Sequence, residues 1–417
     1  MKKWWSAFIS ALLWGVLGNA SEVIAERAPY SGIDSGFPAS ETALEAMRER
    51  ADVGAERSHM WSVWEGLTRA KSNVELPAFL TWYGASEVFS DSEKMASTER
   101  DLRHALLVTV SHRGPDPASA PPLIVYAHYN RAAYRHIREY RLHLASGLAA
   151  IDASARRSGQ ILQFPPFPRN AVVLKTVWWP VSDDAATPLP VWDPAENPAR
   201  TSGNNYLTWS RVVAISTKIS GVSDQRNDVE LLGRRFSSAR SVGTDAFYRL
   251  VLDQALADQV MRDPAAKKLA LMLLGRKLRA RDTLVLVAVH VATREVPDWV
   301  WGTFWWHDFP NNGRFAAGRP RGLAEPWAHY LMDVSFDTDK PLEPDGSPHI
   351  AFNPYLEARF GDAGHGSGVV SNCMTCHRRA SMGFVTPFLV TRGKEDTATK
   401  RDALKTSSLW TIPIQAH

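Results

Sequence analysis

The fold is decided by the run Thr283-Leu-Val-Leu-Val-Ala-Val-His-Val-Ala292, in which only Thr283 and His290 are polar. A run rich in valine and leucine is typical of a strand, and the lack of polar alternation indicates that both faces are buried. We therefore expect this strand at the centre of a sheet. A second expected strand, Trp299 to Asp308, follows after a short connection.

Local signals divide the rest of the chain into helices, strands and turns. Asp263-Pro264 predicts a helix start, because Asp is a good cap and proline suits the first helical position, and Gly275 predicts its end. The proline-rich stretch 164–168 marks a boundary between regions of different character. The other expected elements are helices over 41–72 and 129–150, a helix capped by Thr244, and strands over 123–126, 171–179 and 211–219.

These signals predict an α+β fold with three parts after a leader. Residues 21–165 are expected to be mainly helical, beginning with a linker over 21–40. Residues 166–340 are expected to form a β-rich α+β region. Turn residues dominate 341–417, which we interpret as a cofactor-binding segment.

Residues 1–20 have the layout of a secretory signal peptide. A basic start, Lys2-Lys3, precedes an apolar run over 4–17, and a small-x-Ala site ends at Ala20. The run is shorter than the ~20 residues of a membrane span, which favours a cleaved signal over an uncleaved anchor. We expect a periplasmic protein with no transmembrane span in its mature form.

Composition excludes several classes of protein. The chain has 417 residues, of which 45% are hydrophobic and 22% charged, which excludes a disordered chain and a multi-span membrane protein. Its 48 basic and 44 acidic residues give a formal net charge of +4. That balance is too small and too evenly spread to favour nucleic acid, so we expect no nucleic-acid binding.

Both cysteines of the chain lie in Cys373-Met-Thr-Cys376-His377, the covalent attachment signature of haem c. Each thiol adds to one vinyl group of the porphyrin, and two intervening residues let both thiols reach. The imidazole of His377 then lies beneath the ring, where it can be the proximal iron ligand. One motif predicts one covalent haem c.

Three other interpretations of the two cysteines are weaker. A disulfide over a two-residue loop contributes little to a chain of this size. A thioredoxin-like redox pair belongs to a strand-to-helix context early in a small α/β unit, whereas this pair follows a glycine-rich loop over 361–368. A structural zinc needs four ligands, and the chain has no second cysteine pair.

The position of the motif limits which residues can bind the iron from the other side. The 40 residues after His377 contain one methionine, Met382, and one histidine, the terminal His417. A small class I cytochrome c instead has its motif near the start and its methionine ligand far downstream. We therefore expect a segment that is not a complete class I fold, with the iron either five-coordinate or bound by an upstream residue, for which His307 is the first candidate.

Upstream residues that could face a haem are found on the predicted strands. His290 is more typical of a satisfied core histidine than of a ligand. Lys175 is expected to extend to solvent at a sheet edge, or to pair with a haem propionate or buried carboxylate, and Arg378 and Arg379 are further propionate candidates. Alternation also predicts one aromatic face, which is either a haem lining or simple core; its members are Trp299, Trp301, Thr303, Trp305 and His307.

Residues 284–379 resemble a family of exported bacterial monohaem c-type cytochromes of unassigned activity. The resemblance rests on Trp299-Val-Trp-Gly-Thr-Phe-Trp-Trp-His-Asp308, Phe352-Asn-Pro354 and Ser371-Asn-Cys-Met-Thr-Cys-His377. It implies haem c and export, without a reaction. A fold-level analogy to cytochrome P460-like proteins, whose haem motif also lies near the end of a β-rich domain, implies an open iron site.

Three functions are compatible with these expectations. The leading one is single-electron transfer by a periplasmic monohaem c-type cytochrome, with a redox partner protein. The second is a haem-c enzyme with an open iron site acting on peroxide, oxygen or nitrogen oxides. The third is a haem-based sensor or binding protein.

Overall fold

The computed structural model describes residues 33, 36–71, 74–90, 122–159, 163–193, 206–311, 313–357, 371–382 and 404–416. The predicted signal segment, 1–20, lies outside the described residues, as does most of the predicted linker, 21–40. None of the helices in the described ranges is both long enough and apolar enough to cross a membrane.

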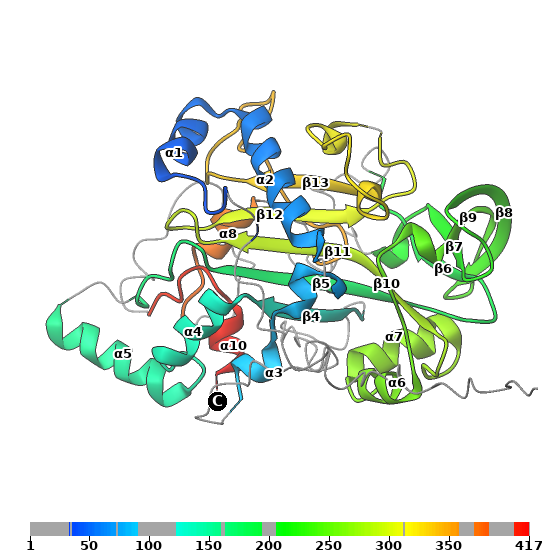
Figure 1. Ribbon diagram of the computed structural model, residues 1–417, viewed down its shortest axis with the longest axis horizontal. Helices are drawn as coiled ribbons and strands as arrows, with labels where there is room; N and C mark the ends of the chain where they lie inside the picture. Colours follow the sequence, from blue (N-terminus) through cyan, green and yellow to red (C-terminus); the bar gives the residue numbers. More distant parts are fainter. Residues whose placement is uncertain are drawn as a thin grey trace, which may run out of the picture.

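A seven-stranded antiparallel sheet organises the molecule (Figure 1). The strand order is β13-β12-β11-β5-β4-β3, and β10 pairs with one end of β11. β11 is fully buried, with β12 and β5 as its neighbours, which confirms the central strand expected over 283–292. The bounds are β3 Tyr83–Gly84, β4 Ile124–Tyr129, β5 Val172–Val181, β10 Arg249–Val251, β11 Thr283–Thr293, β12 Val300–Trp306 and β13 Tyr330–Ser335.

Two smaller sheets accompany the large one. A four-stranded sheet has the order β6-β7-β9-β8, with β7 and β9 parallel, and ends in the long β8–β9 hairpin at the right of Figure 1. A two-stranded ribbon joins β1 and β2. The bounds are β1 Ala70–Lys71, β2 Val74–Pro77, β6 Thr187–Pro190, β7 Val212–Ser216, β8 Val222–Leu231 and β9 Arg234–Gly243.

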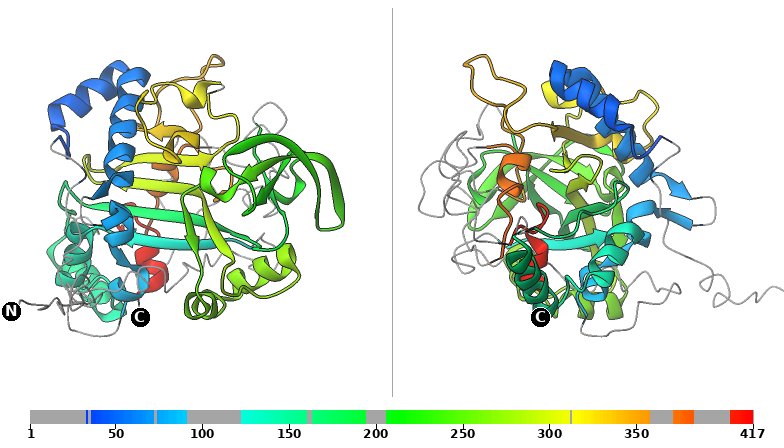
Figure 2. Two further views of the ribbon diagram at one scale, coloured as in Figure 1. Left: turned by 45° about the vertical axis from the view of Figure 1, so that its right-hand side comes forward. Right: turned by 90° about the vertical axis from the view of Figure 1, so that its left-hand side faces the viewer.

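One face of the large sheet is covered by α2, which begins after the cap Asp52 (Figures 1 and 2). The indole of Trp64 stacks on Phe304 of β12 with ring centroids 4.1 Å apart. Met60 fills the space above Gly302, where a Cβ atom would lie 2.3 Å from the methionine sulfur. The helix therefore approaches the sheet closely because β12 offers a glycine there. The two N-terminal helices are α1 Glu41–Arg50 and α2 Val53–Thr68.

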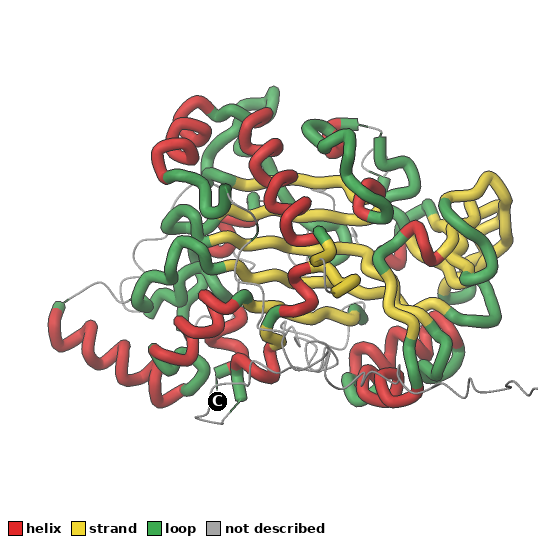
Figure 3. The backbone as a smooth tube through the Cα atoms, in the orientation of Figure 1, coloured by secondary structure: helices red, strands yellow, loops and turns green. Residues whose placement is uncertain are grey.

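The remaining helices lie around the sheet, and Figure 3 separates them from the strands. α7 runs from Pro264, with Asp263 as its cap, to Leu274 before a left-handed Gly275, which confirms the helix expected there. The bounds of the others are α3 Ala85–Val88, α4 Arg131–Glu139, α5 Ala145–Ser158, α6 Gln254–Val260, α8 Cys373–His377 and α10 Thr411–Gln415.

Two expected helices are wrong in part. The expected helix over 129–150 is two helices, because Asn130 ends β4 and caps α4, and the chain turns at Arg141 with φ of 54° before α5 begins. The helix that Thr244 was expected to cap is a single 3₁₀ turn followed by β10, and α6 begins only after the cap Asp253.

The structure confirms a mixed α+β fold. Strands β3 and β4 lie before the proline-rich stretch 164–168 and the other strands of the large sheet after it, so the regions 21–165 and 166–340 contribute to one sheet. Helix α8, in the 341–417 segment, packs against β12 through Trp301. Phe304 of the same strand faces α2, and residues an odd number apart point to opposite faces of a strand. The side chain of Trp301 therefore points away from α2. The right-hand view of Figure 2 shows α8 and α2 on opposite sides of the sheet.

Candidate functional site

The Cys-x-x-Cys-His motif forms a single helical turn, α8, held by its cap. The side chain of Asn372 accepts a hydrogen bond from the Thr375 amide at 2.9 Å and donates one to the Asp337 carbonyl at 2.8 Å. Residues three apart lie on the same side of a helical turn, so Cys373 and Cys376 share one side of α8. The cap thus connects the turn to the chain just after β13.

The environment of the two thiols keeps them protonated. The Cys373 side chain is buried, and its Sγ donates to the Ala351 carbonyl at 3.3 Å. Burial, together with the nearby carboxylate of Glu357, raises the pKa of Cys373 well above its usual value and that of Cys376 to about 12. The thiols are not joined in a disulfide. Redox-active cysteine pairs need a lowered thiol pKa, so this environment disfavours a thioredoxin-like role.

His377 is held in one tautomer by a backbone carbonyl. Its Nδ1 lies 2.8 Å from the Ser408 carbonyl oxygen, and an oxygen acceptor requires that Nδ1 carry the proton. Burial, and the positive charge of Lys175, lower the pKa of His377 to about 3, so the ring is neutral. Its Nε2 lone pair is therefore available to a ligand. The imidazole ring of His377 also packs on the indole of Trp301, with ring centroids 3.8 Å apart.

The Ser408 carbonyl is positioned by an unusual turn. Ser407 and Ser408 both have positive φ, 48° and 62°, which residues with a side chain rarely adopt. The hydroxyl of Thr406 donates to the Leu409 carbonyl at 3.1 Å, and its amide donates to the Ala380 carbonyl at 3.0 Å. These bonds hold the turn against the residues that follow α8.

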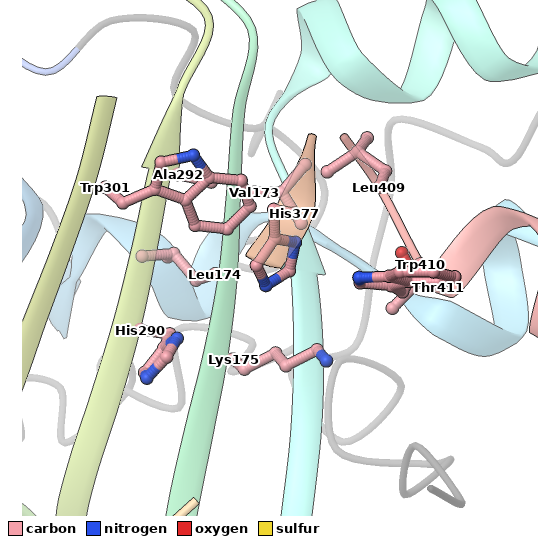
Figure 4. Close-up of a pocket in the computed structure, with 10 residues that line it drawn as sticks. All are labelled: Val173, Leu174, Lys175, His290, Ala292, Trp301, His377, Leu409, Trp410 and Thr411. Carbon is pink, nitrogen blue, oxygen red and sulfur yellow. The ribbon is translucent and has the colours of Figure 1, made fainter. Parts of the chain in front are cut away.

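His377 points into a pocket between the large sheet and the C-terminal residues (Figure 4). Upstream strands supply most of its wall, and residues 409–411 supply the rest. The expectation that no residue after His377 supplies an iron ligand concerns ligands and not the wall, so it stays a prediction. The upstream residues that line the pocket are Val173, Leu174, Lys175, His290, Ala292 and Trp301.

His290 enters this pocket from the central strand. Its side chain is buried, and its Nε2 makes no hydrogen bond with any described residue, although Glu357 Oε1 lies 3.2 Å away. His290 is therefore a buried histidine, as expected, whose Nε2 has an ion-pair contact but no hydrogen bond within the described part of the chain. Strand pairing places His290 opposite Lys175 of β5 and Thr303 of β12, on the same face as Trp301.

The structure does not bring His307 to this pocket. It follows β12 at the end remote from Trp301, and six residues of strand span about 20 Å. There its Nδ1 accepts a hydrogen bond from the Phe309 amide at 2.9 Å, and its backbone amide donates to the His329 carbonyl. Burial lowers the pKa of His307 to about 4, which agrees with a neutral ring in the core.

The expected aromatic face divides between pocket and core. Trp301 lines the pocket, whereas Trp305 packs among Trp192 and Phe315. Trp299 lies before β12 with a positive φ of 64° and packs on Phe167. Trp301 is therefore the member of the predicted face that packs on His377 of the motif.

The remaining predicted residues lie around α8. Arg378 pairs with Asp298 at 3.2 Å, and the charge of Arg379 acts on Cys376. The amide of Met382 donates to the Leu404 carbonyl, and Met382 is not part of the pocket wall. His417 lies outside the described residues.

Within the described ranges, no group of three or more His, Cys, Asp or Glu side chains could hold a metal ion. A scan against protein-family models, a search of curated proteins and a search of solved structures each found no match to this chain.

Proposed function

We propose that the chain is a monohaem c-type cytochrome that transfers single electrons, with haem bound through Cys373 and Cys376 and His377 as the proximal ligand. The observation that carries the proposal is the hydrogen bond from His377 Nδ1 to the Ser408 carbonyl. An imidazole that ligates a metal usually donates its other N–H to a carbonyl or carboxylate, which fixes the ring and raises its basicity. His377 has that arrangement.

The residues present fit a covalently bound haem. Two protonated thiols lie on the same side of a one-turn helix, and the neutral imidazole next to them faces a pocket with valine, leucine, alanine and tryptophan in its wall. A cation, Lys175, lies in the same wall, where it suits an acidic propionate. These features support the proposal over a disulfide or a nucleophilic cysteine.

When bound, the haem supplies an iron centre that gains and loses one electron. This chain's residues would hold and shield that centre. Ser408 fixes the orientation of His377, Trp301 packs against its ring, and the apolar wall limits the access of water. A surrounding of low polarity and an imidazole fixed by a hydrogen bond are two means by which a protein sets the reduction potential of the iron.

Covalent attachment is tested by haem staining after denaturing electrophoresis of the exported protein. We expect the wild type to stain, and the variant with both Cys373→Ala and Cys376→Ala to lose the stain. His377→Ala should lose much of its haem or change its visible spectrum. A stained double-cysteine variant would contradict the proposal, as would an unaltered His377→Ala spectrum.

The periplasmic location and a redox partner protein are part of the same proposal. They rest on the signal layout over 1–20 and on the attachment of haem c outside the cytoplasm. Sequencing the amino terminus of the exported protein tests the first point. We expect the mature chain to begin at Ser21.

A further inference from the structure

We infer that His290 is the second axial ligand of the iron, an inference that rests on the proposed haem site. His290 and His377 line the same pocket, one from the central strand and the other from α8. Figure 4 shows both imidazoles at the pocket, with the side chain of Lys175 below His377 in the view. No residue of the motif itself supplies a ligand from the second side.

The hydrogen bonding of His290 favours a ligand role. Only 7% of the residue is exposed, and its Nε2 has no hydrogen-bond partner among the described residues. Buried polar groups are nearly always paired, so a ring nitrogen that makes no hydrogen bond within the described residues and lies beside a pocket is open to a ligand there. Imidazole is a common iron ligand, and β11, which carries His290, is buried along its whole length.

The other candidates are less suitable as the second axial ligand. His307, the first candidate from the sequence, lies at the remote end of β12 and already accepts a hydrogen bond from Phe309. Met382 is outside the pocket wall. The competing role for His290 is an ion pair with Glu357, whose Oε1 lies 3.2 Å from Nε2. That role would leave the iron's coordination independent of His290.

The test compares ferric spectra and electron paramagnetic resonance of the full-length holoprotein with His290→Ala, His290→Met and the control His307→Ala. Covalent haem is first measured in each by staining, because attachment depends on the cysteines. We expect a low-spin wild type, a His290→Ala variant that becomes high-spin, and recovery of the low-spin signal when imidazole is added. His307→Ala should match the wild type.

His290→Met keeps a ligand of different chemistry, so it should remain low-spin with a raised reduction potential. It carries the test if His290→Ala does not fold. A high-spin wild type, or a low-spin His290→Ala spectrum without added imidazole, would overturn this inference alone. An unchanged potential in His290→Met would also overturn it. A wild type without covalent haem would overturn the proposed function and this inference together.

Discussion

At the scale of single residues, the Ser407–Ser408 turn is the least expected feature of the site. Two consecutive non-glycine residues with positive φ cost roughly 1–2 kcal/mol each, and such strain persists only where the surrounding structure enforces it. Here it directs a carbonyl at the proximal imidazole. The strain is therefore linked to the orientation of His377.

Substitution of Ser408 separates backbone geometry from side-chain chemistry. Ser408→Gly should keep the wild-type haem spectrum and change stability by no more than about 1 kcal/mol, because glycine adopts positive φ freely. Ser408→Pro should lower the free energy of unfolding by more than about 1 kcal/mol and disturb the haem spectrum, because proline fixes φ near −65°. Visible spectra and urea unfolding of both variants provide the check. A wild-type spectrum in Ser408→Pro would show that the carbonyl is not needed.

At the scale of elements, the contact between α2 and β12 determines how closely the helix covers the sheet. Gly302→Ala should destabilise the protein by about 1–3 kcal/mol, because its Cβ would overlap buried Met60. Met60→Ala creates space at the same point, so the double variant should be less destabilised than the sum of the single variants. Urea unfolding of the four proteins measures the coupling. Additive effects would contradict the steric argument.

A matched control lies on the same helix. At Gly54 an added Cβ would meet only Asp52 Oδ1, at an ordinary 3.6 Å. Gly54→Ala should therefore be neutral or stabilise the protein by up to about 1 kcal/mol through helix propensity.

The loop before the motif is attached to β13 by a charged histidine. Burial opposes the charge of His349, but the carboxylates of Asp333 and Glu343 outweigh burial and raise its pKa from 6.5 to about 9. A raised pKa stabilises the fold fully below pH 6.5, and this contribution is lost as pH rises through about 9.

Removing the charge should remove that pH dependence. We expect His349→Gln to be less stable than the wild type by ~3 kcal/mol at pH below the unfolded-state pKa, since each pKa unit corresponds to about 1.4 kcal/mol. The difference should shrink as pH rises through about 9. Urea unfolding across this pH range measures it, and a difference that grows with pH would contradict the assignment.

At the scale of the whole molecule, the described part of the 341–417 segment packs on the large sheet and on β6 of the four-stranded sheet. Asn353 donates to the Thr303 hydroxyl at 2.8 Å, and the Tyr355 hydroxyl donates to the Pro190 carbonyl at 2.7 Å. His377 packs on Trp301. Much of the pocket wall also belongs to upstream strands.

We therefore expect the isolated segment, exported with a signal peptide, to be degraded or to lack the wild-type spectrum. The full chain should be protected from protease under the same conditions. An isolated segment that folds and reproduces the wild-type spectrum would show that the sheet is dispensable. That result would also restore an autonomous cytochrome fold as an explanation.

Sequence information was sufficient where the determinants are local. The central strand and the helix from Pro264 to Gly275 follow from apolar content and from caps beside the element. The break after β4 was missed because Asn130, a polar residue in a helical pattern, ends one element and caps the next. The contacts of His290 could not be predicted, because they come from strands and loops far away in sequence, such as the one that carries Glu357. Residues 409–411 carry no periodic signal that relates them to β5 and β11.

The burial of Cys373 also bears on the biogenesis of the protein. The residue is 6% exposed, and its thiol donates a hydrogen bond to the Ala351 carbonyl. An enzyme that attaches haem therefore cannot reach this thiol in the folded chain. On the proposed function, ligation must come before α8 docks on β12. The segment that carries α8 would then dock on the upstream sheet only after haem has been attached to it. Haem attachment would thus precede the last folding step, and a chain in which α8 docks first would fold without its haem.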